Sequence, residues 1–134
     1  EYIKEAAYRD TNATFVKTME LLDLPNPPTC ILYPDDFASY GGINAINDRG
    51  LDIPQDISVA GYDGIRIGRH LEPQLTTLRQ NTKQIGAQAA EYLIRLIENP
   101  KTTVAQTVVI EGEVYEGKTV GTMETAFRES NSLR

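Results

Sequence analysis

The sequence contains no tryptophan and only one cysteine, Cys30, among its 134 residues. A single cysteine cannot form an internal disulfide, so the sequence favours a reducing compartment over secretion. No apolar run approaches the ~20 residues that a membrane-spanning helix needs, and no basic segment followed by an apolar stretch marks a signal peptide. We therefore expect a cytoplasmic protein that has no membrane partner.

Basic residues and histidine are also scarce. The chain has 13 Lys and Arg against 19 Asp and Glu, a net charge of −6. This charge argues against direct binding of this segment to the phosphate backbone of a nucleic acid. His70 has no second histidine or cysteine at ligand spacing, so no metal site is expected. Glycine motifs for phosphate or dinucleotide binding are absent, and no nucleophile elbow accompanies His70. We expect no cofactor and no enzymatic activity.

Helical and strand patterns alternate along the chain. Two short apolar runs between turn signals, 29–33 and 57–62, are typical of strands buried on both faces. A helix is predicted between them, capped by Asp36 and ending near Arg49. Strand, helix and strand within about 35 residues make a right-handed βαβ unit. The predicted fold is therefore α/β with a parallel sheet.

Two further helices are predicted outside this unit. One begins near Thr11, and the other follows Asn81, with Gln84 completing a capping box. The apolar stripe of the second consists of Ile85, Ala89, Tyr92, Leu93, Leu96 and Ile97. Extended segments are expected at 75–79, 107–110 and 113–120, and a tail at 121–134.

Apolar residues at helical spacing predict which faces of the first two helices point inward. In the helix from about Thr11 they are Phe15, Val16, Met19 and Leu22. In the helix after Asp36 they are Phe37, Ile43, Ala45 and Ile46. The pair Gly41-Gly42 inside this second helix indicates close packing rather than phosphate binding.

Two aspartates follow the predicted parallel strands directly. Asp35 comes after the first strand and Asp63 after the second. Ligands of open α/β sheets bind beyond the carboxyl ends of the strands, and a fixed carboxylate accepts strong hydrogen bonds from hydroxyl groups. A small polyol is therefore one candidate ligand. The alternative is structural, with Asp36 and Asp63 capping a helix or a turn. A phosphoryl-accepting receiver domain fits poorly, because only one helix separates these strands.

An ordered set of motifs resembles the effector-binding region of the LacI/GalR family of bacterial transcriptional regulators. The resemblance covers about three quarters of the chain. It rests on Asp35-Asp36-x-x-Ser39-x-Gly41, Gly50-Leu51-x-Ile53-Pro54-x-Asp56-Ile57-Ser58-Val59, Gly61-Tyr62-Asp63 and Pro73-x-Leu75-Thr76-Thr77-x-x-Gln80. It implies a periplasmic-binding-protein-like fold of two three-layer α/β lobes with a small-molecule effector, commonly a sugar, between them.

The resemblance also implies a division of the chain and a set of partners. Residues 1–134 would be an incomplete fragment, the C-terminal part of the effector-binding domain. Residues 1–79 and about 106–120 would belong mainly to the second lobe, and about 80–105 would cross to the first. Such regulators act as homodimers and bind DNA through a separate helix-turn-helix domain, which this chain does not contain.

Individual roles carry over only to matching positions. Asp63 matches the family's acid that accepts hydrogen bonds from the effector, and Asp35 stands where many members have asparagine. Thr82 lies where some members present an aromatic ring, and Tyr8 is the nearest candidate for an aromatic contact before the first helix. The dimer contacts resemble the surface around Tyr40 and the loop that contains Ile67, His70 and Leu71.

Two other functions share these features. A solute-binding protein of a sugar transporter has the same fold, although the Pro-x-Asp-Ile-Ser-Val and Leu-Thr-Thr segments favour the regulator. An enzyme that uses Asp35 and Asp63 as an acid/base pair lacks any accompanying catalytic group. The sequence therefore predicts a sensor of a small metabolite.

Overall fold

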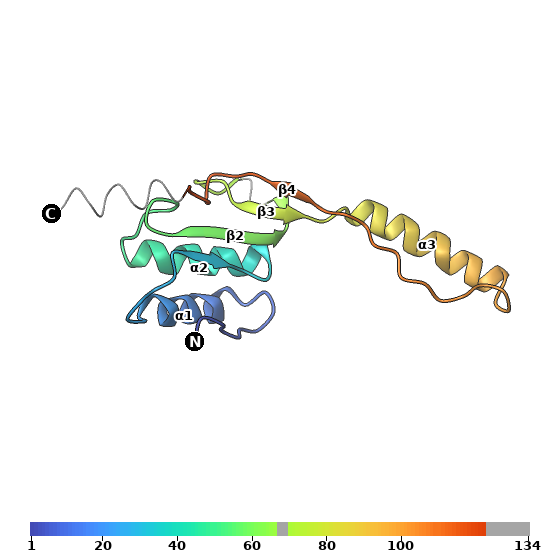
Figure 1. The fold of residues 1–134 in the computed structure, drawn as a ribbon, viewed down its shortest axis with the longest axis horizontal. Coiled ribbons are helices and arrows are strands. Elements are labelled where there is room, and N and C mark those ends of the chain that lie inside the picture. The colour runs from blue at the N-terminus through green and yellow to red at the C-terminus, as the bar shows by residue number, and fades with distance from the viewer. Residues whose placement is uncertain (67–69, 123–134) are drawn as a thin grey trace.

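The computed structural model describes residues 1–66 and 70–122. Its sheet has four strands in the order β1 (Cys30–Leu32), β2 (Ser58–Asp63), β3 (Thr76–Arg79) and β4 (Glu113–Tyr115) (Figure 1). Strands β1, β2 and β3 run parallel, whereas β4 pairs antiparallel with β3. Helix α2 (Asp36–Asp48) connects β1 to β2, which confirms the predicted βαβ unit.

The core lies between α2 and the strands that it covers. Its fully buried side chains include Val59 of β2, Ile46 of α2 and Leu75, which directly precedes β3. Strand β1 is an edge of the described sheet, so only Ile31 of its three residues is buried, and Cys30 and Leu32 are exposed. The expectation that this strand is buried on both faces was therefore wrong for β1.

Helix α1 (Thr11–Leu22) packs on α2 with a face that the apolar spacing predicted only in part, since Leu22 packs against the core as predicted. Its buried residues are Thr14, Thr18 and Leu21, whereas Val16 is 54% exposed. The threonines can be buried because their hydroxyls are paired, Thr14 with the Asp10 carbonyl and Thr18 with the Tyr33 hydroxyl at 2.9 Å.

In α2, Ile43, Ala45 and Ile46 are buried as predicted, but Phe37 is exposed. The Phe37 ring instead lies beneath the guanidinium of Arg9, 5.2 Å from ring centroid to Cζ. This cation–π contact accounts for an aromatic side chain on the outer face of the helix.

The glycine pair in α2 allows the two helices to approach closely, as the sequence predicted. A Cβ atom on Gly41 would lie 2.2 Å from the carbonyl oxygen of Thr11, and one on Gly42 would lie 1.9 Å from the Tyr33 hydroxyl. The first turn of α1 therefore rests directly on the backbone of α2.

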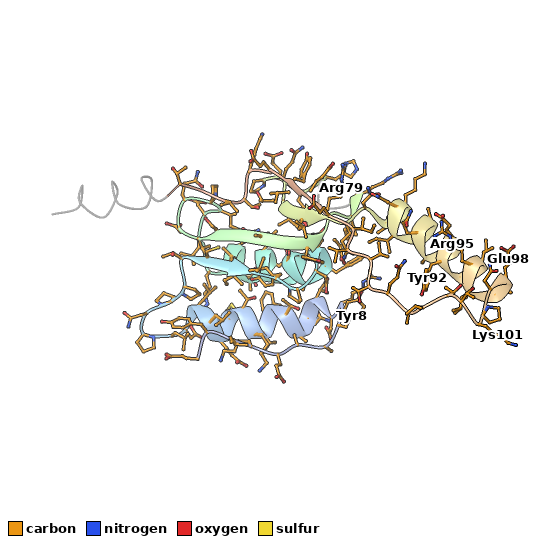
Figure 2. The ribbon with its side chains drawn as sticks, turned by 45° about the vertical axis from the view of Figure 1, so that its right-hand side comes forward. Tyr8, Arg79, Tyr92, Arg95, Glu98 and Lys101 are labelled. Atoms are coloured by element: carbon orange, nitrogen blue, oxygen red, sulfur yellow. The ribbon has the colours of Figure 1, made fainter. Side chains whose placement is uncertain are left out.

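Helix α3 (Thr82–Glu98) projects away from the sheet, together with the segment that returns from it (Figures 1 and 2). Asn81 caps it by accepting from the Gln84 amide at 3.2 Å, as predicted. None of its residues is buried, and its apolar stripe is partly exposed, with Leu93 56% and Ile97 70% accessible.

The segment that returns from α3 pairs with β3, the strand from which the chain left the sheet. Residues 107–110 form no strand, contrary to the prediction, and pairing begins only at Glu113 in β4. Arg79 of β3 bridges Glu113 at 2.6 Å where the two segments lie side by side. The predicted tail lies outside the described residues from 123 onward. No helix in the described part of the chain has the length and apolarity to cross a membrane.

Candidate functional site

Asp35 lies at the carboxyl end of β1 and is the N-cap of α2. Its Oδ1 accepts from the Ala38 amide at 2.8 Å, so the prediction that Asp36 is the cap was wrong by one residue. The Asp35 side chain is 1% exposed, and its Oδ2 has no hydrogen-bond partner among the described residues. A buried carboxylate oxygen without a donor is unusual and is an available acceptor for a ligand.

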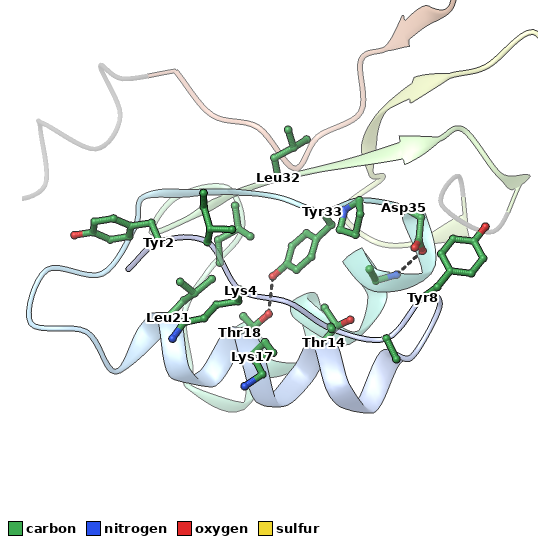
Figure 3. A pocket seen from close by; sticks show the side chains of 16 residues that line it. Tyr2, Lys4, Tyr8, Thr14, Lys17, Thr18, Leu21, Leu32, Tyr33 and Asp35 are labelled. Atoms are coloured by element: carbon green, nitrogen blue, oxygen red, sulfur yellow. Dashed lines mark hydrogen bonds between the residues drawn. The ribbon is translucent and has the colours of Figure 1, made fainter.

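Tyr8 and Asp35 line the same cavity (Figure 3). The cavity has a volume of about 360 Å³ and lies between the N-terminal segment, α1 and β1. Tyr33 lies in its wall, and burial raises the pKa of this phenol to about 12, so the hydroxyl stays neutral. The structure therefore brings together an aromatic ring, a neutral hydroxyl and an unpaired carboxylate oxygen.

Asp63 closes β2 in a left-handed backbone conformation, with φ at 106°. Gly64 follows with φ at 68°, so the chain turns sharply at the carboxyl end of the sheet. The Asp63 Oδ1 accepts from the Gln80 side-chain amide at 2.6 Å. A non-glycine residue with positive φ costs about 1–3 kcal/mol and is common at functional sites.

The remaining predicted site residues are more widely spread. Asp63 and Thr82 do not line the cavity that contains Tyr8 and Asp35. Thr82 is exposed at the start of α3, beside a hollow of about 210 Å³ that Gln80 and Glu113 also line. The structure thus joins Tyr8 with Asp35 and joins Asp63 with Gln80, but it does not unite all four predicted ligand residues in one cavity.

The four residues predicted at a dimer interface differ in exposure. Tyr40 is 42% exposed, and His70 is exposed. Leu71 is half-buried and packs against the core of the same chain. Ile67 lies outside the described residues.

Asp36, assigned from the sequence only as a cap, is instead the centre of a buried hydrogen-bond network. The side chain is 1% exposed and accepts from the Thr77 hydroxyl at 2.6 Å and from the Ile65 amide at 2.7 Å. Gly61 makes room for it, since a Cβ there would lie 2.5 Å from Asp36 Oδ1. Burial raises the pKa of Asp36 above 3.8, an effect that the donors oppose and the charge of Asp63 reinforces.

This raised pKa predicts a pH dependence of stability. Between pH 3.8 and the higher folded-state pKa, the folded chain holds the Asp36 proton more tightly than the unfolded chain does. The free energy of unfolding, relative to that of Asp36→Asn, should therefore fall as pH rises through this window. Urea denaturation of both proteins from below pH 3.8 to neutrality measures it, and a constant difference would contradict the assignment.

Within residues 1–66 and 70–122, no three His, Cys, Asp or Glu side chains are grouped so that they could hold a metal ion.

Comparisons with known proteins match almost the whole chain. Residues 2–120 fit the family model described as a periplasmic binding protein-like domain. A probable HTH-type transcriptional repressor, ExuR, of Bacillus subtilis is 37% identical over 76% of this chain and 30% of its own length. The ribose operon repressor of Haemophilus influenzae is 38% identical over 68% of this chain and 27% of its own.

A solved structure extends the comparison to three dimensions. The lac repressor dimer bound to operator and an anti-inducer superposes with a TM-score of 0.74 and 28% identity, over 83% of this chain and 38% of that one. The chain thus spans about 30% of the length of the first curated relatives that it matches.

Proposed function

Since the chain belongs to the periplasmic binding protein-like domain family, and its relatives are LacI-type repressors, we propose that it is part of the effector-binding domain of such a regulator. It binds a small metabolite and controls DNA binding by a separate helix-turn-helix domain. The relatives are transcriptional repressors and not enzymes, and they do not favour the alternative of a transport protein. The regulator would act in the cytoplasm, where its operator is.

The effector in this proposal is a sugar or a related hydroxyl-bearing molecule. The observation that carries it is the buried, unpaired Oδ2 of Asp35 in the wall of a cavity shared with Tyr8. Asp63 supplies a second acceptor at the next strand end, and both carboxylates can accept hydrogen bonds from hydroxyl groups. The ribose operon repressor among the relatives supports the same class of ligand.

We assign the remaining predicted residues to the effector site, to the other lobe and to a dimer interface. Thr82 contributes to the effector site from the start of α3, and residues about 80–105 cross to the first lobe. The exposed apolar stripe of α3 supports this crossing, because a free surface helix rarely leaves such a stripe in water. A homodimer would form through Tyr40, Ile67, His70 and Leu71, and the lac repressor dimer among the structural neighbours supports that assembly.

A ligand screen of the complete regulator tests the sugar assignment. Ligands that bind only the folded state raise the unfolding midpoint, so free sugars, sugar acids, sugar phosphates and nucleobases are compared by thermal shift, with D-ribose among them. We expect a hydroxyl-bearing sugar to give a positive shift. Asp63→Ala should then weaken its binding roughly 5- to 150-fold, as expected for a lost buried acceptor.

Two outcomes of the screen would contradict two different parts of the proposal, the sugar assignment and the role of Asp63. A flat response across the panel would remove the sugar assignment. A positive shift with unchanged affinity in Asp63→Ala would remove Asp63 from the site, and Glu116→Ala, a substitution at an exposed glutamate, serves as the control for a change of net charge.

A further inference from the structure

Both carboxylate oxygens of Asp36 accept hydrogen bonds within the chain, and these bonds hold the turn that presents Asp63. One bond reaches the Ile65 amide, two residues beyond Asp63, and the other reaches Thr77 in the middle of β3. The Thr77 hydroxyl in turn accepts from the Gly64 amide at 3.3 Å. Residues 64 and 65 are therefore tied to one carboxylate, directly and through Thr77.

The turn needs such support because its backbone is unfavourable. Asp63 has φ of 106°, a conformation that L-residues rarely adopt, and it persists only where the surroundings determine it. Gln80 holds Asp63 from the β3 side. Its side-chain amide donates to the carboxylate at 2.6 Å, and its backbone amide donates to the Asp63 main-chain carbonyl at 3.3 Å. Asp36 holds the following residues from the α2 side.

The packing around Asp36 is built for this contact. Gly61 lies opposite Thr77 in the sheet register, and any larger residue at 61 would displace the Asp36 oxygen. Asp36 is also in the first turn of α2, where the helix dipole stabilises a carboxylate.

We propose that Asp36 is the positioning residue of the effector site: it fixes the direction of the Asp63 carboxylate by binding the Asp63–Ile65 turn through the Ile65 amide and Thr77. This role rests on the proposed function, because it assigns to Asp63 the contact with the effector. Asp36 acts only through Asp63 and makes no contact with the ligand.

Effector affinity in a double-mutant cycle tests the role. The probe is D-ribose, or the sugar with the largest shift in the panel, titrated calorimetrically into the complete regulator. Asp36→Ala should weaken binding roughly 10- to 100-fold, whereas Asp36→Asn, which keeps the shape and one acceptor oxygen, should stay within about threefold. In an Asp63→Ala background, Asp36→Ala should cause no further loss, because the two residues act as one unit.

Additive losses in this cycle would overturn the proposal, since they would mean that Asp36 acts independently of Asp63. Wild-type affinity in Asp36→Ala would overturn it as well. If Asp63→Ala nevertheless binds the effector more weakly than wild type, the proposed function stays intact. If Asp36→Ala does not fold, Thr77→Val replaces it in the cycle, because this isosteric change removes the Thr77 hydroxyl and keeps the Ile65 bond.

Amide hydrogen exchange tests the same role without any ligand, so it remains decisive even if no sugar in the panel binds. In Asp36→Ala, the Ile65 and Gly64 amides should exchange at least about tenfold faster, while the Val59 amide inside the sheet keeps its protection. Unchanged exchange at Ile65 would overturn the proposal. Failure of the sugar screen with accelerated exchange would refute only the assigned ligand and leave the support of the turn established.

Discussion

Replacement of Gly41 by alanine is expected to lower the free energy of unfolding by about 2–3 kcal/mol, although alanine is the better helix former. The added Cβ would lie 2.2 Å from the Thr11 carbonyl oxygen, and the obstacle is backbone, which cannot rotate away. Helix α1 must shift outward, and the buried bond between Thr18 and Tyr33 would lengthen with it. Urea denaturation followed by circular dichroism measures the loss.

Gly86 provides the matched control for this substitution. It also lies inside a helix, α3, but nothing is within 4 Å of the position that a Cβ would occupy. Gly86→Ala should therefore raise stability by up to about 1 kcal/mol, the ordinary gain in helix propensity. If the two substitutions had effects of the same sign, close packing of α1 on α2 would not be the reason for glycine at position 41.

Thr119→Val is expected to destabilise the sheet by about 2–4 kcal/mol, although the two side chains have nearly the same shape. The Thr119 hydroxyl is fully buried, accepts from the Thr76 amide at 2.9 Å and donates to the Val59 carbonyl at 2.7 Å. A methyl group in its place can do neither, and the cost of desolvating those backbone groups remains. The shift of the urea midpoint measures the effect.

Thr119→Ser separates the hydrogen bonds from the packing. Serine keeps the hydroxyl and removes one buried methyl group, so the expected loss is about 1 kcal/mol. A larger loss in the serine variant than in the valine variant would show that the methyl group, rather than the hydroxyl, stabilises this position.

The sequence predicted those elements whose local pattern agrees with the final packing. The βαβ unit and the capped helix α3 follow from short apolar runs, an N-cap residue and helical periodicity, and the structure has both. The inner face of α1 was not predictable in this way, because Thr14 and Thr18 are buried only through partners elsewhere, such as Tyr33. The edge position of β1 likewise depends on strand order, which periodicity does not encode.

At the candidate site, the positions of Asp35 and Asp63 at strand ends could be predicted, but their environments could not. The network of Asp36 joins residues 29 and 41 positions apart in the sequence, so only the folded chain reveals it. The one available signal was Gly61 inside the predicted strand, since a glycine there marks the close approach of another group.

The late position of Thr119 in the sequence also determines when its hydrogen bonds to the sheet can form during synthesis. Its partners Val59 and Thr76 precede it by 60 and 43 residues, and α3 lies between them and Thr119 in the sequence. At about 5–20 residues per second, the ribosome makes the last of these contacts available seconds after β3 has emerged. During that interval the Val59 carbonyl and the Thr76 amide lack the hydrogen bonds that the Thr119 hydroxyl later makes to them.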